Sequence, residues 1–139
     1  MSAAVYLIDT SALARILKDP VRSTWKKPLE EGIIAVCPIT EIEYLYSARN
    51  AEDRVELAED LKALFSWALM DDRAYAHAWD VQKALTGRSQ YRSAGAVDLL
   101  VAATAELQRL TVLHYDNDFE TIAAVTRQPT QWLAPPGTL

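Results

Sequence analysis

The chain has 139 residues, of which half are apolar, 14 are basic and 19 are acidic, so its formal net charge is −5. This length and balance predict a single globular domain over residues 1–139, with a core over about 4–134. Only 4 glycines and 6 prolines argue against a disordered or fibrous chain, and the acidic balance argues against a metal-free, non-specific nucleic-acid binder.

Cysteine content and the first residues bear on the compartment. The single Cys37 excludes an internal disulfide, which fits a reducing environment. The start of the chain has no basic segment, and its apolar run over 4–8 is too short for a signal peptide or a membrane span. We therefore expect a cytoplasmic protein without a membrane segment.

Short apolar runs alternate along the chain with stretches of helical periodicity. In chain order, the pattern predicts strands at 4–8, 33–36, 66–70, 111–115 and 131–133, and helices at 12–18, 21–31, 41–48, 51–65, 74–85, 97–110 and 118–125. We expect the second helix to be interrupted at Pro28 and closed by Gly32, and residues 86–95 and the tail to be irregular. The alternation predicts an α/β fold with a mostly parallel sheet of four to five strands flanked by helices.

Acidic residues stand where these strands end or these helices begin. Asp9 and Asp116 follow strands, Glu43 and Asp98 lie near helix starts, and Asp118 stands beside Asp116. Since ligands bind beyond the carboxyl ends of parallel strands, we expect these acids to converge. Like charges repel, so a hard divalent cation such as Mg²⁺ or Mn²⁺, which prefers oxygen ligands, gives a reason for the gathering. Without these five acids, acidic and basic residues are equal in number.

Each acid also has an ordinary structural explanation. Asp9 suits a turn or helix cap, Thr40-x-x-Glu43 fits a capping box, Asp98 suits the first turn of a helix, and Asp116-Asn117-Asp118 suits an Asx turn. Glu41 competes with Glu43 but would point elsewhere on the helix. The joint pattern, with every acid at one edge of one sheet, favours the metal site.

Other side chains offer less chemistry. His77 and His114 lack zinc-ligand spacing, and we interpret both as structural or partly exposed. The chain contains no glycine-rich phosphate loop and no nucleophile elbow. Thr10 or Ser11 would orient a water molecule at the metal rather than act as a nucleophile.

Four motifs in order carry a resemblance to a known family. The motifs are Asp9-Thr10-Ser11-Ala12-Leu13, Pro38-Ile39-Thr40-x-x-Glu43-Tyr44-x-Tyr46, Asp98-Leu99-Leu100-Val101-Ala102-Ala103 and His114-Tyr115-Asp116-Asn117-Asp118-Phe119-Glu120-x-Ile122-Ala123. Together and in this order they resemble the four acidic motifs of the PIN domain. The second motif departs from the family pattern at Ser47, where glycine is usual. The similarity runs over about residues 5–134 and looks like the VapC toxins of type II toxin–antitoxin modules.

The resemblance implies a Mg²⁺- or Mn²⁺-dependent endoribonuclease that cuts tRNA, rRNA or mRNA and leaves a 5′-phosphate and a 3′-hydroxyl. It also implies a homodimer that is inhibited by a cognate VapB-type antitoxin. The acidic quartet carries over as Asp9, Glu43, Asp98 and Asp116, with Asp118 as an additional metal ligand.

The chemistry of phosphodiester hydrolysis suggests how these residues divide the task. We expect Asp9 and Asp116 to ligate the metal directly, and Asp98 and Glu43 to bind a second metal or hold its waters. Crowding of like charges should raise the pKa of at least one carboxylate. RNA also needs basic contacts, for which the candidates are Arg15, Lys18, Arg88 and Arg92, although ordinary solvated charge explains each equally well.

Three rival interpretations of the pattern remain open. A DNA- or flap-directed metal nuclease shares the acidic cluster, but this small chain shows no obvious DNA-threading insertion. A non-catalytic PIN-fold module that binds RNA or protein would be favoured by loss of ligand acids, and here all four are present. A receiver-like domain would need an acidic pair at the first strand and a late lysine after a strand, whereas Asp9 stands alone.

Overall fold

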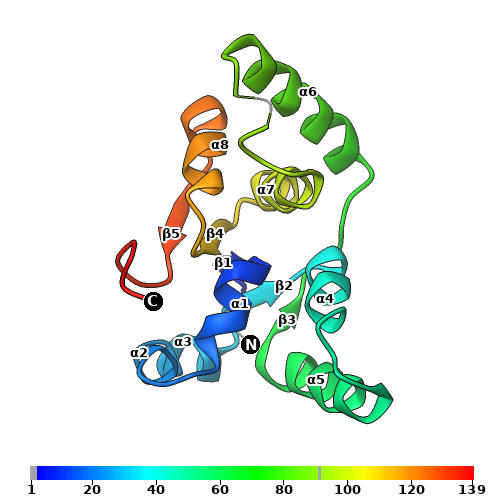
Figure 1. The fold of residues 1–139 in the computed structure, drawn as a ribbon, viewed down its shortest axis with the longest axis vertical. Helices are drawn as coiled ribbons and strands as arrows, with labels where there is room; N and C mark the ends of the chain where they lie inside the picture. Colours follow the sequence, from blue (N-terminus) through cyan, green and yellow to red (C-terminus); the bar gives the residue numbers. More distant parts are fainter. Residues whose placement is uncertain (1–2, 91) are drawn as a thin grey trace.

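The structure is a computed structural model that describes residues 3–90 and 92–139 (Figure 1). Its strands are β1 (Tyr6–Ile8), β2 (Ile34–Val36), β3 (Ser66–Trp67), β4 (Thr111–His114) and β5 (Thr130–Trp132). Its helices are α1 (Thr10–Ile16), α2 (Val21–Thr24), α3 (Lys26–Glu31), α4 (Pro38–Leu45), α5 (Ala51–Leu64), α6 (Arg73–Gly87), α7 (Ala96–Gln108) and α8 (Asp118–Thr126). The predicted α/β class and strand number are confirmed.

The five strands form one parallel sheet in the order β3-β2-β1-β4-β5. From the central β1 the chain first builds outward through β2 and β3, and later returns to the other side of β1 through β4 and β5. Connections therefore leave in opposite directions from β1 and β4. Sheets of this topology bind ligands beyond the carboxyl ends of such strands, and we call this region of the molecule the crevice. Ile8 pairs with Leu113, so the two strands end almost level with each other.

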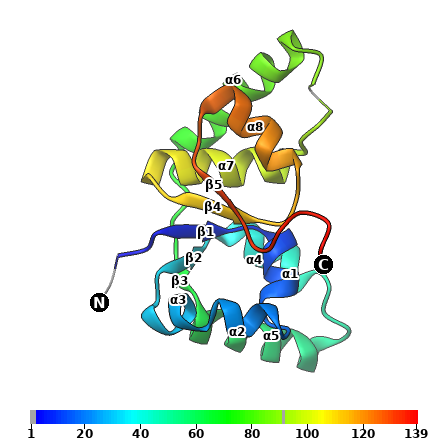
Figure 2. The same ribbon diagram turned by 90° about the vertical axis from the view of Figure 1, so that its left-hand side faces the viewer.

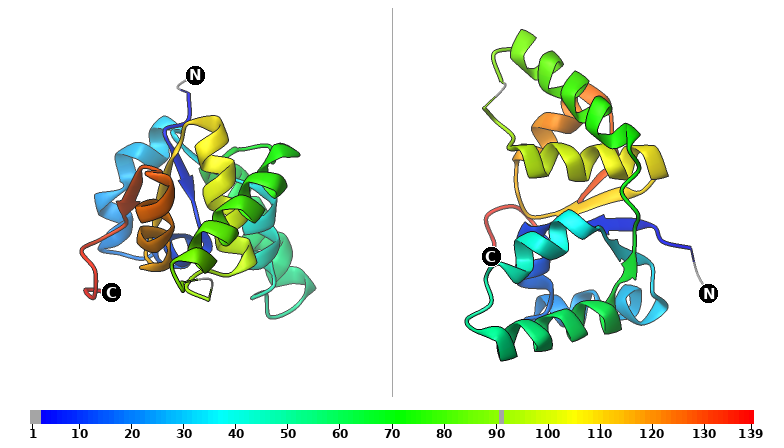
Figure 3. Two further views of the ribbon diagram at one scale, coloured as in Figure 1. Left: turned by 90° about the horizontal axis from the view of Figure 1, so that it is seen from above. Right: turned by 90° about the vertical axis from the view of Figure 1, so that its right-hand side faces the viewer.

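Helices cover both faces of the sheet, as Figure 2 shows, with α6, α7 and α8 on one face and α1, α2, α3 and α5 on the other. The strands serve both layers because successive side chains point to opposite faces. Leu7 and Val112 belong to the first core, whereas Ile8 and Leu113 belong to the second. Helix α4 packs against α1 and α5 and also contacts α7 (Figure 3).

The helical segment over 21–31 is broken at Trp25, so the prediction of a break at Pro28 is wrong. Pro28 is the third residue of α3, where a backbone N–H would have no partner within the helix, so its missing N–H costs little there. The side chain of Trp25 is bonded to the residue that follows the outermost strand β5, because its indole Nε1 donates to the Leu133 carbonyl at 2.8 Å. Gly32 ends α3 in the left-handed conformation, as expected.

Helix α4 begins at Pro38 and ends at Leu45, earlier at both ends than the predicted 41–48. Proline suits the first helical position, where its fixed φ matches the helix and its missing N–H is not needed. Cys37 is the N-cap, and Thr40 lies buried inside the helix with its hydroxyl 3.6 Å from the Cys37 sulfur. The capping box, the alternative explanation for Thr40 and Glu43, is therefore not formed.

Most other boundaries also differ by a few residues from the sequence-based expectation, and two of these differences lie near the ends of α6 and β4. Helix α6 continues through Gly87, so the loop begins at Arg88. Strand β4 ends at His114, one residue early, because the Tyr115 N–H donates to the Ser11 hydroxyl rather than to a strand partner, with 2.8 Å between the two atoms. Within the described ranges, no helix has the length and apolar character that crossing a bilayer requires.

Candidate metal site

Asp9 stands at the carboxyl end of β1 and caps α1. Its carboxylate accepts hydrogen bonds from the backbone N–H groups of Ser11 and Ala12 at 3.1 and 3.2 Å, and from the Ser11 hydroxyl at 2.7 and 2.9 Å. The residue is only 4 % exposed. Burial raises the pKa of Asp9, and these hydrogen bonds oppose the rise. The helix-cap explanation is therefore correct for Asp9, and it also holds the carboxylate at the crevice.

Asp98, Asp116 and Asp118 come together from two different elements. Asp98 lies in the first turn of α7, whereas Asp116 and Asp118 lie at the junction of β4 and α8. One oxygen atom from each carboxylate lies within 4.8 Å of the others. All three residues are partly buried, so water screens their charges incompletely.

Repulsion between these carboxylates raises the pKa of two of them. The pKa of Asp98 is raised to about 7, first by burial and then by the negative charges of Asp116, Asp9 and Asp118. A hydrogen bond from the backbone of Gly95 opposes the rise. The pKa of Asp118 is also raised, by burial and by Asp116. Three neighbouring carboxylates offer only hard oxygen donors, so this donor set fits Mg²⁺ or Mn²⁺.

Glu43 lies outside this three-residue cluster. It is exposed on α4 and accepts a hydrogen bond from the Thr10 hydroxyl, the first residue of α1. Thr10 follows Asp9 directly, so this bond links Glu43 to the residue next to Asp9. The Glu43 carboxylate is not one of the three that lie within 4.8 Å of one another. Glu41 points elsewhere, as expected, and accepts from the indole Nε1 of Trp67 at 2.9 Å.

Ser11 joins the two central strands beyond their ends. Its hydroxyl donates to Asp9 after β1 and accepts from the Tyr115 N–H after β4. Arg15 contacts the same two segments. Its Nη1 donates to the Ser11 carbonyl at 2.7 Å, and its guanidinium lies 4.9 Å from the centre of the Tyr115 ring. The hydroxyls of Thr10 and Ser11, expected to orient water, are both engaged with acidic residues.

The remaining basic candidates lie on exposed parts of the chain. Lys18 follows α1, Arg88 caps α6, and Arg92 lies in the segment that leads to Asp98 and α7.

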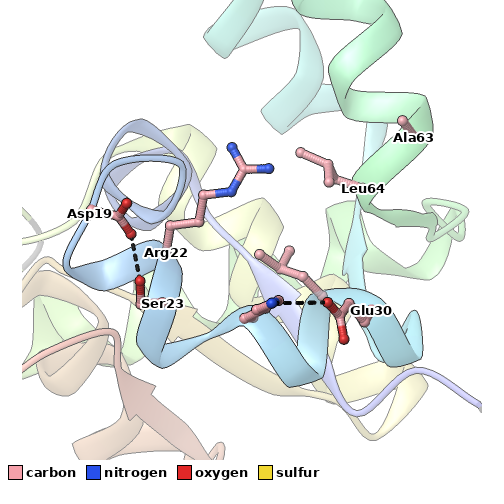
Figure 4. Close-up of a pocket in the computed structure, with 8 residues that line it drawn as sticks. Asp19, Arg22, Ser23, Glu30, Ala63 and Leu64 are labelled. Atoms are coloured by element: carbon pink, nitrogen blue, oxygen red, sulfur yellow. Dashed lines mark hydrogen bonds and ion pairs between the residues drawn. The ribbon is translucent and has the colours of Figure 1, made fainter.

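A separate hollow of about 460 Å³ lies between α2, α3 and the end of α5 (Figure 4). Leu29 and Leu64 contribute apolar surface to it. Four of its polar residues form two pairs, since Ser23 donates to Asp19 at 2.7 Å and Lys26 pairs with Glu30 at 3.9 Å. This hollow contains no crowded acids and differs in chemistry from the crevice.

The comparison with protein families agrees with this geometry. The family model described as PIN domain matches residues 6–125, which include all five acids. The chain belongs to the PIN-domain family. This PIN domain is 41 % identical over 133 residues to Ribonuclease VapC21 of Mycobacterium tuberculosis, with 96 % of each chain covered. It is 42 % identical over 139 residues to Ribonuclease VapC51 of the same organism, covering 99 % of this chain and 98 % of the relative. The resemblance inferred from the four motifs is thereby confirmed.

Solved structures share the fold at lower sequence identity. A DNA-bound VapBC from Salmonella typhimurium gives a TM-score of 0.78 at 17 % identity, covering 94 % of this chain and 99 % of that chain. VapBC2 from Rickettsia felis, bound to a DNA fragment from the promoter, gives 0.77 at 14 % identity, covering 92 % and 98 %. At these identities the likeness concerns the fold of the PIN domain alone.

Sequence patterns alone do not identify the buried residue that is hydrogen-bonded to the backbone of Asp116. His114, interpreted from the sequence as structural or partly exposed, is fully buried and bonded to Glu120 and to the Asp116 backbone. The signal that could have found it is its place, as the last residue of a buried strand two positions before an acid.

The raised pKa of Asp98 predicts how stability depends on pH. Native Asp98 keeps its proton up to about pH 7, whereas an unfolded aspartate has a pKa of 3.8, so the native state binds more protons between these values. The free energy of unfolding should therefore fall as pH rises through this window. We expect Asp98→Asn to melt at a higher temperature than wild type at about pH 8, and the difference to shrink towards about pH 4.

Thermal unfolding across this pH range measures the effect. Mg²⁺ should stabilise wild type more than the variant, because binding to the native state adds stability. Asp80→Asn, which replaces an exposed acid on α6, serves as the matched control and should keep the pH dependence of wild type, since it retains Asp98. A stability difference between Asp98→Asn and wild type that stays constant with pH would contradict the assignment.

Proposed function

We propose that this protein is the toxin of a type II toxin–antitoxin module and acts as a divalent-metal-dependent endoribonuclease. The observation that carries this proposal is the convergence of Asp9, Asp98, Asp116 and Asp118 beyond the adjacent ends of β1 and β4. Relatives named as VapC ribonucleases, 41–42 % identical over nearly the whole chain, support the reaction and the RNA substrate.

The positions of the acidic residues suggest which of them bind the metal and which position water or substrate. Asp98, Asp116 and Asp118 would hold the metal directly, since their oxygens already lie within 4.8 Å of one another. Asp9, which the sequence predicts as a direct ligand, is not one of these three residues and would act from the buried side, either as a further ligand or through its negative charge. Glu43, held by Thr10, would act from the rim by positioning water or the substrate. When bound, the ion would lower the pKa of a coordinated water and neutralise the charge that develops on the phosphate.

The chain's own hydrogen bonds hold this arrangement in place before substrate arrives. Ser11 fixes the Asp9 carboxylate and the Tyr115 backbone with one hydroxyl, so the ends of β1 and β4 cannot separate freely. The Asp118 N–H donates to Asp116 Oδ1 at 2.9 Å and orients that carboxylate. A site preorganised in this way needs little rearrangement to stabilise the transition state.

The solved structures that share this fold are named as VapBC, and we propose that a VapB-type antitoxin binds and inhibits this chain. We also propose that it acts in the cytoplasm, where RNA and the antitoxin are available. The single cysteine fits that reducing compartment.

Cleavage of RNA tests the proposed reaction. Wild type should cut total cellular RNA into discrete fragments only when Mg²⁺ or Mn²⁺ is present, and the fragments should carry 5′-phosphates and 3′-hydroxyls. Asp9→Asn and Asp116→Asn each remove a charge without removing volume, and should slow cleavage by at least about 100-fold. The cognate antitoxin should suppress cleavage when added.

Asp80→Asn should cleave like wild type, since Asp80 is an exposed residue within α6 and is not part of the acidic cluster. Single-stranded RNA and DNA of the same sequence separate a ribonuclease from a DNA-directed enzyme. Equal, metal-independent background from wild type and both site variants would instead indicate a non-catalytic binding module. Products that end in 2′,3′-cyclic phosphates would rule out hydrolysis by in-line attack of water.

The basic candidates predict a salt effect. Replacing Arg88 and Arg92 together by Gln should weaken RNA binding and flatten its dependence on salt, by roughly 0.7 in log–log slope for each phosphate that is no longer neutralised. The matched control replaces Arg109 and Arg127, which precede β4 and β5 at the opposite edge of the sheet. Binding isotherms over a salt series measure both pairs, and an unchanged slope for the first pair would remove it from the RNA surface.

We further propose a homodimer that uses the exposed aromatic face of α6. Tyr75 and Trp79 are 58 % and 65 % exposed beside Leu100 of α7, and apolar surface of this kind commonly forms protein contacts. Trp79→Glu should shift the protein towards monomer in multi-angle light scattering. Val55→Glu, at an exposed apolar position on α5, should leave the mass unchanged. A wild type that is monomeric at all concentrations would disprove the dimer.

A further inference from the structure

Directly behind the acidic cluster lies a buried histidine that the proposed chemistry leaves unexplained. His114 is the last residue of β4 and has no exposed surface. Its ring packs against Phe119 and Trp132, with centroid distances of 5.3 and 4.7 Å. An apolar residue would fill the same space without the cost of burying two ring nitrogens, so the hydrogen bonds of those nitrogens are the informative feature.

Both ring nitrogens have partners, and the partners determine the position of the proton. The Asp116 backbone N–H lies 3.1 Å from His114 Nδ1 and can only donate, so Nδ1 must present its lone pair. In the neutral ring the proton then sits on Nε2. That nitrogen lies 2.9 Å from Glu120 Oε1, an oxygen that can accept it.

Glu120 is itself held in place by the next strand. The hydroxyl of Thr130, the first residue of β5, donates to the same Oε1 at 2.8 Å. The result is a relay of side chains, Thr130–Glu120–His114, that ends on the backbone of Asp116. Such an arrangement of an acid behind a histidine fixes both the tautomer and the orientation of the ring.

We propose that His114 is a positioning residue, whose Nδ1 holds the Asp116 amide and so fixes the turn that carries Asp116 and Asp118 at the acidic site. Glu120 and Thr130 select the tautomer that this requires. The consequence for metal binding rests on the proposed function, whereas the hydrogen-bond arrangement does not.

The turn shows why one backbone hydrogen bond matters there. The Asp116 carbonyl accepts the Phe119 N–H at 3.2 Å, and Asp116 Oδ1 accepts the Asp118 N–H. The Asp116 amide is thus the attachment point of a short chain of bonds that sets the relative position of two carboxylates. Loss of that attachment would let the two acids move apart under their mutual repulsion.

Two substitutions at one position separate the roles of the two ring nitrogens. In His114→Asn the amide oxygen takes nearly the place of Nδ1 and can still accept the Asp116 N–H, but the bond to Glu120 is lost. In His114→Gln the side chain is closer in volume to histidine and can still reach Glu120, but it has no acceptor at the Nδ1 position. A role in packing alone therefore favours Gln, whereas the positioning role favours Asn.

Calorimetric titration of the purified protein with Mn²⁺ measures the consequence. His114→Gln should lose about tenfold in Mn²⁺ affinity, the size of effect seen when groups behind metal ligands are removed, whereas His114→Asn should stay within about threefold of wild type. Unfolding temperatures of both variants are measured beside the titration, so that binding is compared only where each is folded.

Nitrogen NMR of the metal-free protein reads the arrangement directly. Wild type should show a pyridine-type Nδ1, a protonated Nε2 and a scalar coupling across the hydrogen bond between Nδ1 and the Asp116 amide nitrogen. A protonated Nδ1, or a Gln variant that binds Mn²⁺ at least as tightly as the Asn variant, would overturn the inference. If wild type bound no Mn²⁺, the proposed function would fail, and the NMR coupling alone would decide between support and refutation of the role of His114.

Discussion

Mutual repulsion of carboxylates at the ends of β1 and β4 is the constraint on which the rest of the site depends. The fold opposes it with donors that belong to the backbone: the N–H groups after Asp9, the Gly95 backbone near Asp98 and the Asp118 N–H near Asp116. These bonds do not remove the repulsion, because the pKa of Asp98 is still raised to about 7. The protein folds around a concentration of negative charge that the proton on Asp98 relieves in part and that a bound cation would neutralise further.

The four crevice acids are not equivalent, and their differences follow from where each attaches. Asp9 is buried and fully bonded, so it is as much a part of the fold as of the site. Asp98, Asp116 and Asp118 face one another with fewer partners. Structural and chemical roles therefore coexist in the same residue, since a helix N-terminus that receives a carboxylate also fixes its direction.

Much of this was predictable because the controlling signals are local. Alternating strands and helices dictate a parallel sheet, and acids that follow β1 and β4 must then share an edge, whatever the details of packing. The break at Trp25 and the early end of β4 were not predictable, since they depend on partners distant in sequence. Trp25 bonds to a carbonyl 108 residues away, and the Tyr115 N–H turns to Ser11, 104 residues away. The partner of Glu43 was missed for the same reason, because Thr10 reaches it only in the folded chain.

The N-cap of α4 has a practical consequence for spectroscopy. Cys37 is the only cysteine in the chain, it has no exposed surface, and burial raises the pKa of its thiol. A thiol that is both hidden and protonated reacts slowly with alkylating reagents, since the thiolate is the nucleophile. A cysteine introduced on the surface would therefore be labelled selectively, so fluorescent or spin probes can be attached at chosen positions while the native sulfur stays in place.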